Sequence, residues 1–198
     1  MAQAHSYTLF ATAIGTCAVA WNDIGLTGIW LPAAEGADLR RQVLRRAPRA
    51  HAAPPVGAMA HVVEALARLV AGESVDFAGV VLDLADVEPF DRRVYRAARA
   101  IAPGHVLTYG DLAARVGDGA TAREVGRSLG RNRWPLVVPC HRIVASGNGL
   151  GGFSAPGGTV TKRRLLAIEG ARRGGAPDLF DAPVSEFTRA ASGRESGH

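Results

Sequence analysis

The chain contains little cysteine, almost no lysine and no long hydrophobic run, and each shortage narrows its class. Among 198 residues the cysteines are Cys17 and Cys140 alone. They form no CxxC pair and no chelating set with histidines, so we expect no metal and no cofactor. Two reduced thiols in a cytosolic protein are a simpler interpretation than a disulfide. No apolar run approaches the ~20 residues of a membrane span. Residues 1–6 show no secretory signal, so we expect a cytoplasmic protein, in a bacterial-type cytosol or associated with the nucleoid, that meets no membrane.

Lysine occurs once, at Lys162, so nearly all of the positive charge is arginine, and it is unevenly distributed. Residues 1–90 carry 6 Lys+Arg against 9 Asp+Glu, whereas residues 91–173 carry 15 against 5, a net charge of +10. A general preference of this chain for arginine explains why lysine is rare, but it does not explain why one segment holds the excess. Because the planar guanidinium pairs well with phosphate, the pattern favours a nucleic acid as partner.

The first part of the chain predicts a small α/β domain with an antiparallel sheet, over residues 1–88. Three short β-favouring runs separated by turn residues predict a meander: Tyr7–Ala13, Thr16–Trp21 and Leu26–Leu31. Apolar spacing predicts helices over Asp38–Arg46 and Gly57–Val70. A further strand is expected at Val80–Leu82, a loop at Ala50–Pro55, and a strand position for Cys17.

Residues 89–170 predict a mostly helical, winged helix-turn-helix-like DNA-binding domain, which makes the fold class α+β. An amphipathic helix runs from Phe90 to Ile101, and Thr108 and Thr121 are each placed to cap a following helix. The glycine-containing turn between those two helices is typical of a helix-turn-helix, although helical hairpins are common. A last helix is expected from Thr159 to Glu169, and the Gly-, Ala- and Ser-rich residues 171–198 predict a disordered tail.

The most informative segment is Pro139-Cys140-His141-Arg142, which lies between the apolar Leu136–Val138 and the glycine-rich residues 146–154. A neighbouring base converts a thiol into the attacking thiolate, so this arrangement predicts an activated nucleophile next to a shaped pocket. Cysteine is also a common core residue, and one adjacent histidine does not exclude that interpretation.

With these features, the chain resembles the O6-alkylguanine-DNA alkyltransferases. The resemblance covers residues 90–170 strongly and the first ninety residues only in outline. The matching blocks, in order, are Thr108–Ala113, Ala122–Gly126, Asn132, Pro139–Ile143, Gly151–Ser154 and Lys162–Gly170. The chain departs from the family where Arg133 follows Asn132, and the segment Ala155–Gly158 is longer than in the shortest family loops.

The resemblance implies a repair protein that binds double-stranded DNA and moves the alkyl group of O6-alkylguanine irreversibly onto Cys140, once per molecule; O4-alkylthymine is a second candidate substrate. His141 would remove the thiol proton through a water, and Glu169 would orient the imidazole. Tyr109 would donate to the leaving guanine, and Asn132 would brace the turn before the cysteine. Tyr109, Gly152, Phe153 and Ser154 would bind the base.

The resemblance also implies that the second helix of the helical pair enters the minor groove, where sequence readout is degenerate, and that the chain acts as a monomer. Arg123 would fill the gap left by the flipped nucleotide, although on its own it would be taken for an ordinary surface arginine. The residues expected to contact DNA are Thr108, Ala122, Arg123, Gly126, Arg127 and Arg131.

Three other classes compete with this interpretation. A Cys-His-Glu hydrolase would need an oxyanion hole and repeated turnover, and it gives the helical pair and the charge excess no purpose. A non-enzymatic lesion sensor of the same fold would lack the acceptor cysteine, which is present here. A transcriptional regulator that signals through self-alkylation would be expected to carry a second DNA-binding domain or a further cysteine cluster.

Overall fold

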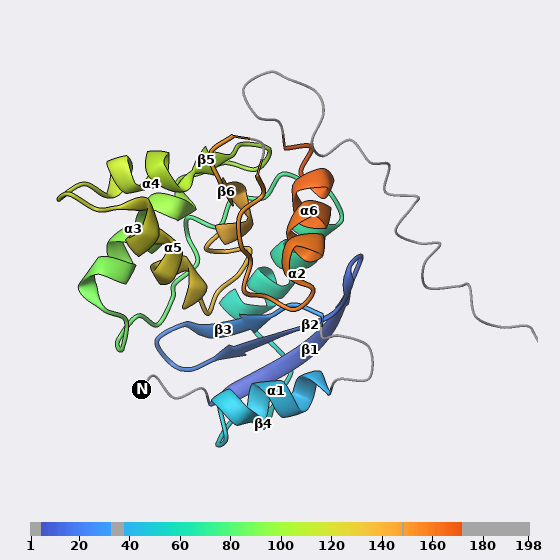
Figure 1. Cartoon of the computed structure of the whole chain (residues 1–198). Coiled ribbons are helices and arrows are strands. Elements are labelled where there is room, and N and C mark those ends of the chain that lie inside the picture. Colours follow the sequence, from blue (N-terminus) through green and yellow to red (C-terminus); the bar gives the residue numbers. More distant parts are fainter. Residues whose placement is uncertain (1–4, 33–37, 148, 172–198) are drawn as a thin grey trace, which may run out of the picture.

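The computed structural model describes residues 5–32, 38–147 and 149–171 (Figure 1). The tail expected from residue 171 lies, from residue 172 onward, outside the described residues. Strands β1 (Ser6–Thr12), β2 (Gly15–Trp21) and β3 (Leu26–Trp30) form the predicted antiparallel meander. A two-residue strand, β4 (His51–Ala52), adds to β1 in parallel, so the sheet order is β3-β2-β1-β4. We expected only a loop there, because two residues are too few to show a strand pattern.

Two helices cover opposite faces of this sheet, as Figure 1 shows: α1 (Leu39–Arg46) on one side and α2 (Ala58–Val70) on the other. Side chains alternate along β2 because successive residues of a strand point to opposite faces. Ala18 and Ala20 pack with α1, whereas Cys17 and Val19 belong to the core on the α2 side. Cys17 is therefore the buried strand residue that the sequence predicted.

The strand expected at Val80–Leu82 is wrong. The segment makes a single isolated bridge, between Leu82 and Leu26. The Arg99 side chain takes up backbone acceptors in and before this segment, because its Nη2 donates to the carbonyl oxygens of Phe77, Ala78 and Val80. The Val80 carbonyl oxygen thus accepts from a guanidinium of the next helix, whereas the Val81 carbonyl oxygen accepts from the Leu26 N–H of β3, which leaves one bridge in place of a strand.

The second half contains the predicted helices. Helices α3 (Pro89–Arg99), α4 (Tyr109–Val116) and α5 (Ala122–Gly130) pack against one another, and α6 (Gly158–Ile168) follows the glycine-rich loop. Thr108 and Thr121 cap α4 and α5, and each helix start is a full capping box, with Asp111 and Glu124 as partners. These local hydrogen bonds explain why both helix starts could be located from the sequence.

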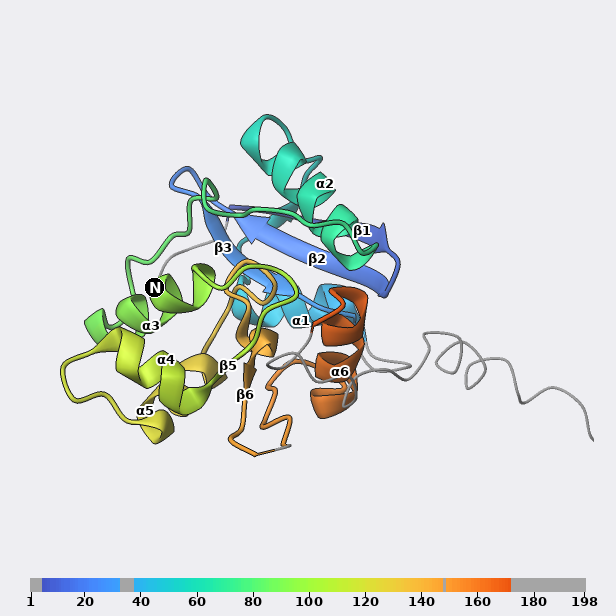
Figure 2. The same ribbon diagram turned by 90° about the horizontal axis from the view of Figure 1, so that it is seen from above.

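Between α4–α5 and α6 lies a parallel pair of two-residue strands, β5 (Leu107–Thr108) and β6 (Ile143–Val144), which no sequence pattern indicated. Figure 2 shows this pair with α3, α4 and α5 on one side and α6 on the other. A 3₁₀ helix, η1 (Cys140–Arg142), leads directly into β6. The pairing with β5 therefore anchors the chain immediately after the candidate nucleophile.

Both halves of the chain contribute to the main hydrophobic core. Its largest cluster joins Val19 of β2 and Leu66 of α2 to Val94 of α3 and to the fully buried Trp134. The indole nitrogen of Trp134 donates to the Leu26 carbonyl oxygen over 2.8 Å, so the segment that leads to Cys140 is fixed to β3.

The boundary between the two expected domains, at residues 88 and 89, stays a prediction. No helix in the described ranges is long and apolar enough to cross a membrane.

Candidate active site

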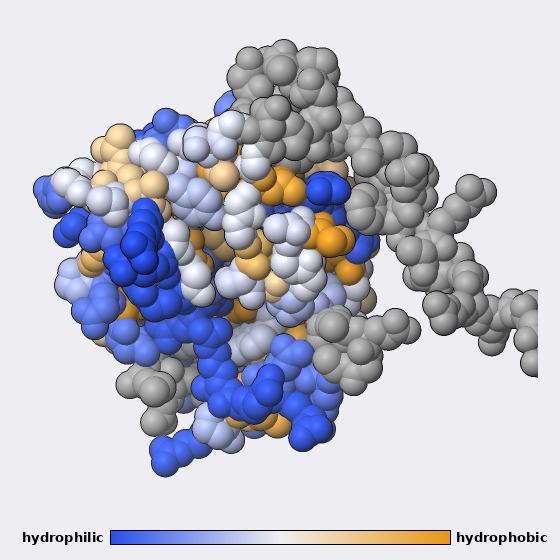
Figure 3. All heavy atoms as spheres, in the orientation of Figure 1, coloured by the Kyte–Doolittle hydropathy of each residue, from blue (hydrophilic) through white to orange (hydrophobic). Residues whose placement is uncertain are grey.

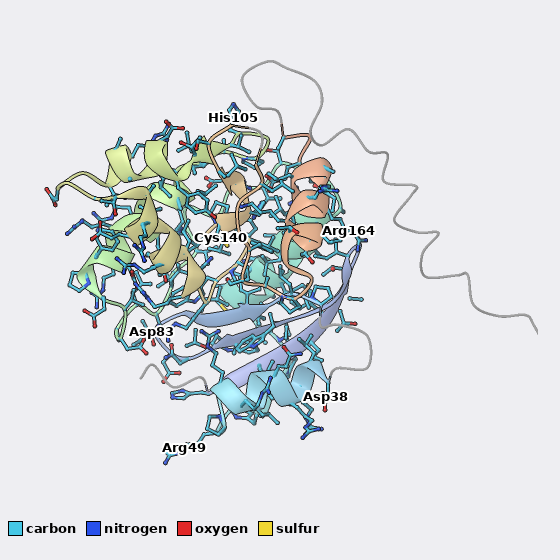
Figure 4. The ribbon with its side chains drawn as sticks, in the orientation of Figure 1. Asp38, Arg49, Asp83, His105, Cys140 and Arg164 are labelled. Atoms are coloured by element: carbon cyan, nitrogen blue, oxygen red, sulfur yellow. The ribbon has the colours of Figure 1, made fainter. Side chains whose placement is uncertain are left out.

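A cavity of about 310 Å³ lies between α5 and the glycine-rich loop, with Cys140 in its wall. In Figure 4 Cys140 lies near the middle of the molecule, between α5 and α6. The cavity volume is at the lower end of the range for small-molecule sites, about 300–1,000 Å³. The lining comes from four segments that are far apart in the sequence: Tyr109, Gly126, Leu129, Gly130, Cys140, Gly152, Phe153 and Ser154. The fold therefore brings all four predicted substrate-binding residues together with the predicted nucleophile.

Asn132 and a strained loop hold the cysteine in place. The Nδ2 of Asn132 donates to the Val138 carbonyl oxygen over 2.9 Å and to Sγ of Cys140 over 3.2 Å, while its Oδ1 accepts from the backbone N–H of Trp134. Within this loop Leu136 has a φ of 77°, a left-handed conformation that costs a non-glycine residue roughly 1–2 kcal/mol. Asn132 therefore bonds to the backbone on both sides of this loop and to the sulfur of Cys140.

Behind the cysteine, His141, Arg142 and Glu169 form a buried network. His141 Nε2 lies 2.9 Å from Glu169 Oε1, and Arg142 donates to both carboxylate oxygens, over 2.9 and 2.8 Å. Arg142 also donates to the Ile101 carbonyl oxygen. The side chains of His141 and Glu169 are 0% and 3% exposed. His141 Nδ1 is buried and has no hydrogen-bond partner among the described residues, so it is the ring nitrogen left for another group.

Burial and hydrogen bonding oppose each other in setting the protonation of this network. Burial raises the pKa of the Cys140 thiol, against the hydrogen bond from Asn132 and the positive charge of Lys162, which lower it. Burial lowers the pKa of His141, although Glu169 opposes this shift. Burial would raise the pKa of Glu169, but hydrogen bonds from His141 and Arg142 and their charges outweigh it and lower the pKa to about 2. The resting site therefore combines a neutral thiol, a neutral imidazole and an ionised carboxylate.

Tyr109, the first residue of α4, reaches across the cavity to the glycine-rich loop. Its hydroxyl donates to the Gly152 carbonyl oxygen over 3.3 Å. Burial and the nearby Cys140 raise its pKa, so the phenol stays protonated and can donate a hydrogen bond. Gly151 makes this approach possible: it has a φ of +70°, and a Cβ there would lie 2.8 Å from Cε2 of Tyr109.

Lys162 is a residue of the site to which the sequence assigned no role. It is fully buried, its Nζ donates to the carbonyl oxygens of Ile143 and Gly152, and it lies 5.7 Å from the centre of the Tyr109 ring. A sequence signal did exist. Lys162 precedes Leu165 and Leu166 at helical spacing, so the only lysine of the chain falls on the buried side of α6.

Helix α5 contributes Gly126, Leu129 and Gly130 to the cavity wall and has an outer face that carries arginines. Arg123 and Arg127 lie four residues apart on one side of this helix, next to the small residues Ala122 and Gly126, while Val125 and Leu129 are buried. Arg123 and Arg127 are exposed, and Figure 3 shows hydrophilic residues gathered over this part of the molecule. The helix that lines the cavity with Gly126 therefore presents two exposed arginines and small residues on its outer face.

Two of the predicted DNA-contacting residues have other partners. Arg131 pairs with the buried Asp91 through two hydrogen bonds of 2.9 and 2.7 Å, which ties the end of α5 to α3. The Thr108 hydroxyl is engaged in the capping box with Asp111. Their side chains therefore hold helices in place, and the arginines left on the outer face of α5 are Arg123 and Arg127.

Both cysteines are free and buried. Burial raises the pKa of Cys17 to about 11, against a weaker opposing hydrogen bond from Thr12, so this second thiol is a poor nucleophile. In the described ranges, no three His, Cys, Asp or Glu side chains gather as a metal site requires.

Several known proteins are similar to this chain. Residues 89–171 match the family model of the DNA-binding domain of 6-O-methylguanine DNA methyltransferase. A methylated-DNA–protein-cysteine methyltransferase of Methanothermobacter thermautotrophicus is 35% identical over 152 residues, which cover 77% of this chain and 78% of the relative. The enzyme of that name from Mycobacterium tuberculosis is 37% identical over 133 residues, covering 67% and 78%.

Solved structures give the same result. The crystal structure of Mycobacterium tuberculosis OGT in complex with DNA has a TM-score of 0.67 and 30% identity, covering 83% of this chain and 92% of that one. The O6-methylguanine-DNA methyltransferase of Pyrococcus kodakaraensis has a TM-score of 0.62 and 27% identity, covering 83% and 99%. The α+β fold class is confirmed. The chain belongs to the methylated-DNA–protein-cysteine methyltransferases, the DNA-binding enzymes that repair methylated DNA.

Proposed function

We propose that this chain repairs O6-alkylguanine in duplex DNA by moving the alkyl group irreversibly to Cys140, so that each molecule acts once. The observation that carries the proposal is the Cys140 thiol in the cavity wall, with the buried His141–Glu169 pair directly behind it. In the reaction a bond forms between Sγ and the alkyl carbon while the bond from that carbon to O6 breaks. The thioether that results has no route back to a thiol, which explains a single turnover.

His141 acts as the base through its unpaired Nδ1, which takes the thiol proton by way of a bridging water. Glu169 accepts from Nε2 and stabilises the imidazolium that forms, as in other nucleophile–base–carboxylate arrangements. Asn132 donates to the sulfur and stabilises the thiolate. The thiol loses one proton and the departing guanine gains one, so the step needs no external acid or base.

The guanine occupies the cavity between Tyr109 and the loop residues Gly152, Phe153 and Ser154. The Tyr109 phenol exchanges its hydrogen bond to the Gly152 carbonyl oxygen for one to the base, which then leaves neutral. Ser154, in the cavity wall, offers its backbone N–H to O6. The longer segment Ala155–Gly158 next to this wall influences which alkyl groups fit, and O4-alkylthymine is a second substrate to test.

A base inside a duplex cannot reach this cavity, so the nucleotide must be flipped out, at a cost of a few kcal/mol. Arg123, exposed in the first turn of α5, fills the vacated position in the stack. The small residues Ala122 and Gly126 let α5 approach the sugar-phosphate backbone in the minor groove, and Arg127 contacts phosphate. The chain acts as a monomer.

The test is the intact mass of the protein after it is mixed with duplex DNA that carries O6-methylguanine. Wild type should gain about 14 Da, the mass of one methylene, and no more with excess DNA. Cys140→Ala should gain nothing, whereas Cys17→Ala, the matched control, should behave as wild type. Uptake by Cys140→Ala, or repair without a mass change, would contradict the proposal; the latter outcome would indicate a hydrolase or another turnover enzyme.

A further inference from the structure

Lys162 is a buried cation that joins three parts of the site. Its Nζ donates to the carbonyl oxygen of Ile143, which follows the cysteine segment, and over 3.1 Å to that of Gly152, which lines the cavity. The same nitrogen lies over the Tyr109 ring, 5.7 Å from its centre. The ammonium has three hydrogens, and the two carbonyl oxygens and the face of the Tyr109 ring provide one partner for each of them.

Among the described residues, no anion balances this charge in the resting site. Lys162 is fully buried, and none of the ion pairs within the described residues includes it. Burying a cation without a carboxylate partner is costly, and neutral carbonyl groups compensate only in part. The titratable groups that interact with its charge are Cys140 and His141 on η1, and the Tyr109 ring faces it from α4. The only one of these that becomes an anion in the proposed reaction is Cys140.

We propose that Lys162 is a positioning residue for alkyl transfer: its ammonium is the electrostatic partner of the Cys140 thiolate, and it holds the Gly152 wall of the cavity against the cysteine segment. This inference rests on the proposed role of Cys140 as acceptor. It differs from activation by His141, because Lys162 removes no proton. It lowers the free energy of the thiolate after the proton has moved.

The role has a distinct pH signature. A lysine that favours the thiolate accelerates thiolate reactions only while the lysine is protonated. Burial lowers the pKa of Lys162 to about 8, and a negative charge on Cys140 opposes this shift. The benefit is therefore present at neutral pH and declines as the pH rises through about 8. A purely structural role, in which Lys162 only packs α6 against the loop, gives no such dependence.

The experiment measures alkylation of Cys140 by iodoacetamide, a neutral thiol reagent, on both sides of pH 8, and transfer from free O6-benzylguanine. Lys162→Met removes the charge and both hydrogen bonds, while Lys162→Gln keeps a donor without the charge. Arg163→Met, which removes an exposed cation from the next position of α6, is the matched control. Both Lys162 variants should react about tenfold more slowly than wild type at neutral pH, equivalent to one unit in the thiol pKa. The difference should narrow above pH 8, and the control should match wild type.

Equal rates of wild type and Lys162→Met at neutral pH would overturn the proposal. The proposal would also be overturned if Lys162→Met reacted more slowly by the same factor at every pH, or if Lys162→Gln reacted at the wild-type rate. Either result would mean that Lys162 has only a structural role. If the variants do not fold, wild type still provides a test. Lys162 is the only lysine, so labelling with ¹³C-lysine gives one side-chain signal; if it titrates below neutral pH, no cation is present and the proposal fails. A wild type that accepts no alkyl group from O6-benzylguanine, but reacts with iodoacetamide as expected, would contradict the proposed function and not the role of Lys162.

Discussion

Replacing Glu169 by glutamine should destabilise the protein as well as slow the reaction. The carboxylate accepts from His141 and twice from Arg142, and its side chain is 3% exposed. Glutamine has one acceptor oxygen and presents an NH₂ group to one of the Arg142 nitrogens. The Arg142 guanidinium, whose side chain is only 4% exposed, would then be buried without a counter-ion.

Two estimates of the magnitude agree. Removing one partner of a buried ion pair typically costs about 3–5 kcal/mol. The pKa of Glu169 falls from 4.5 to about 2 on folding, which corresponds to about 3 kcal/mol of stability at neutral pH. Because the folded pKa lies below the unfolded one, this stability is present above about pH 4.5 and is lost as the pH falls toward 2.

The assay is denaturant unfolding of wild type and Glu169→Gln at neutral pH and at several acidic values. The variant should be about 3 kcal/mol less stable at neutral pH, and the difference should shrink as the pH falls below 4.5. Glu73→Gln is the matched control: Glu73 pairs with Arg68 on the surface, with side chains about half exposed, so its loss should be below about 1 kcal/mol. A Glu169→Gln protein as stable as the control would refute the reasoning.

Predictions for four further variants concern α5 and the glycine-rich loop. Arg123→Ala should slow transfer from duplex DNA by about tenfold or more while sparing free O6-benzylguanine, since a free base needs no flipping; equal losses in single-turnover rates would assign Arg123 to the pocket instead. In an anisotropy titration with undamaged DNA, Arg127→Ala should reduce the slope of log affinity against log salt by about one. Arg131→Ala, in contrast, should leave that slope nearly unchanged and lower the free energy of unfolding by about 2 kcal/mol, because it leaves the buried Asp91 carboxylate unpaired. A reduced slope for Arg131→Ala together with an unchanged slope for Arg127→Ala would contradict the two predictions. Gly151→Ala should slow transfer with unchanged DNA affinity, because the new Cβ meets the Tyr109 ring; a wild-type rate would show that the loop adjusts freely.

Features that depend on neighbouring residues could be predicted from the sequence. The starts of α4 and α5 follow from Thr108 and Thr121, since each capping box closes within four residues. The three strands of the meander follow from short β-favouring runs between turns. The pairs β5–β6 and β1–β4 could not be predicted in this way, because two-residue strands carry no periodicity and exist only where the fold brings distant backbone together.

The sequence by itself determined the family and the candidate nucleophile, since Cys140, His141 and the blocks around them are contiguous motifs. Only the tertiary structure decided which charges have partners. Arg127 and Arg131 look alike in the sequence, yet Arg131 pairs with Asp91, forty residues away, whereas Arg127 stays exposed on the outer face of α5. Lys162 likewise reads as an ordinary helix lysine until η1, α4 and the glycine-rich loop close around it. The physical reason is that a charge is stabilised or left uncompensated by whatever the fold places within a few ångströms of it, and in this chain those neighbours come from distant segments.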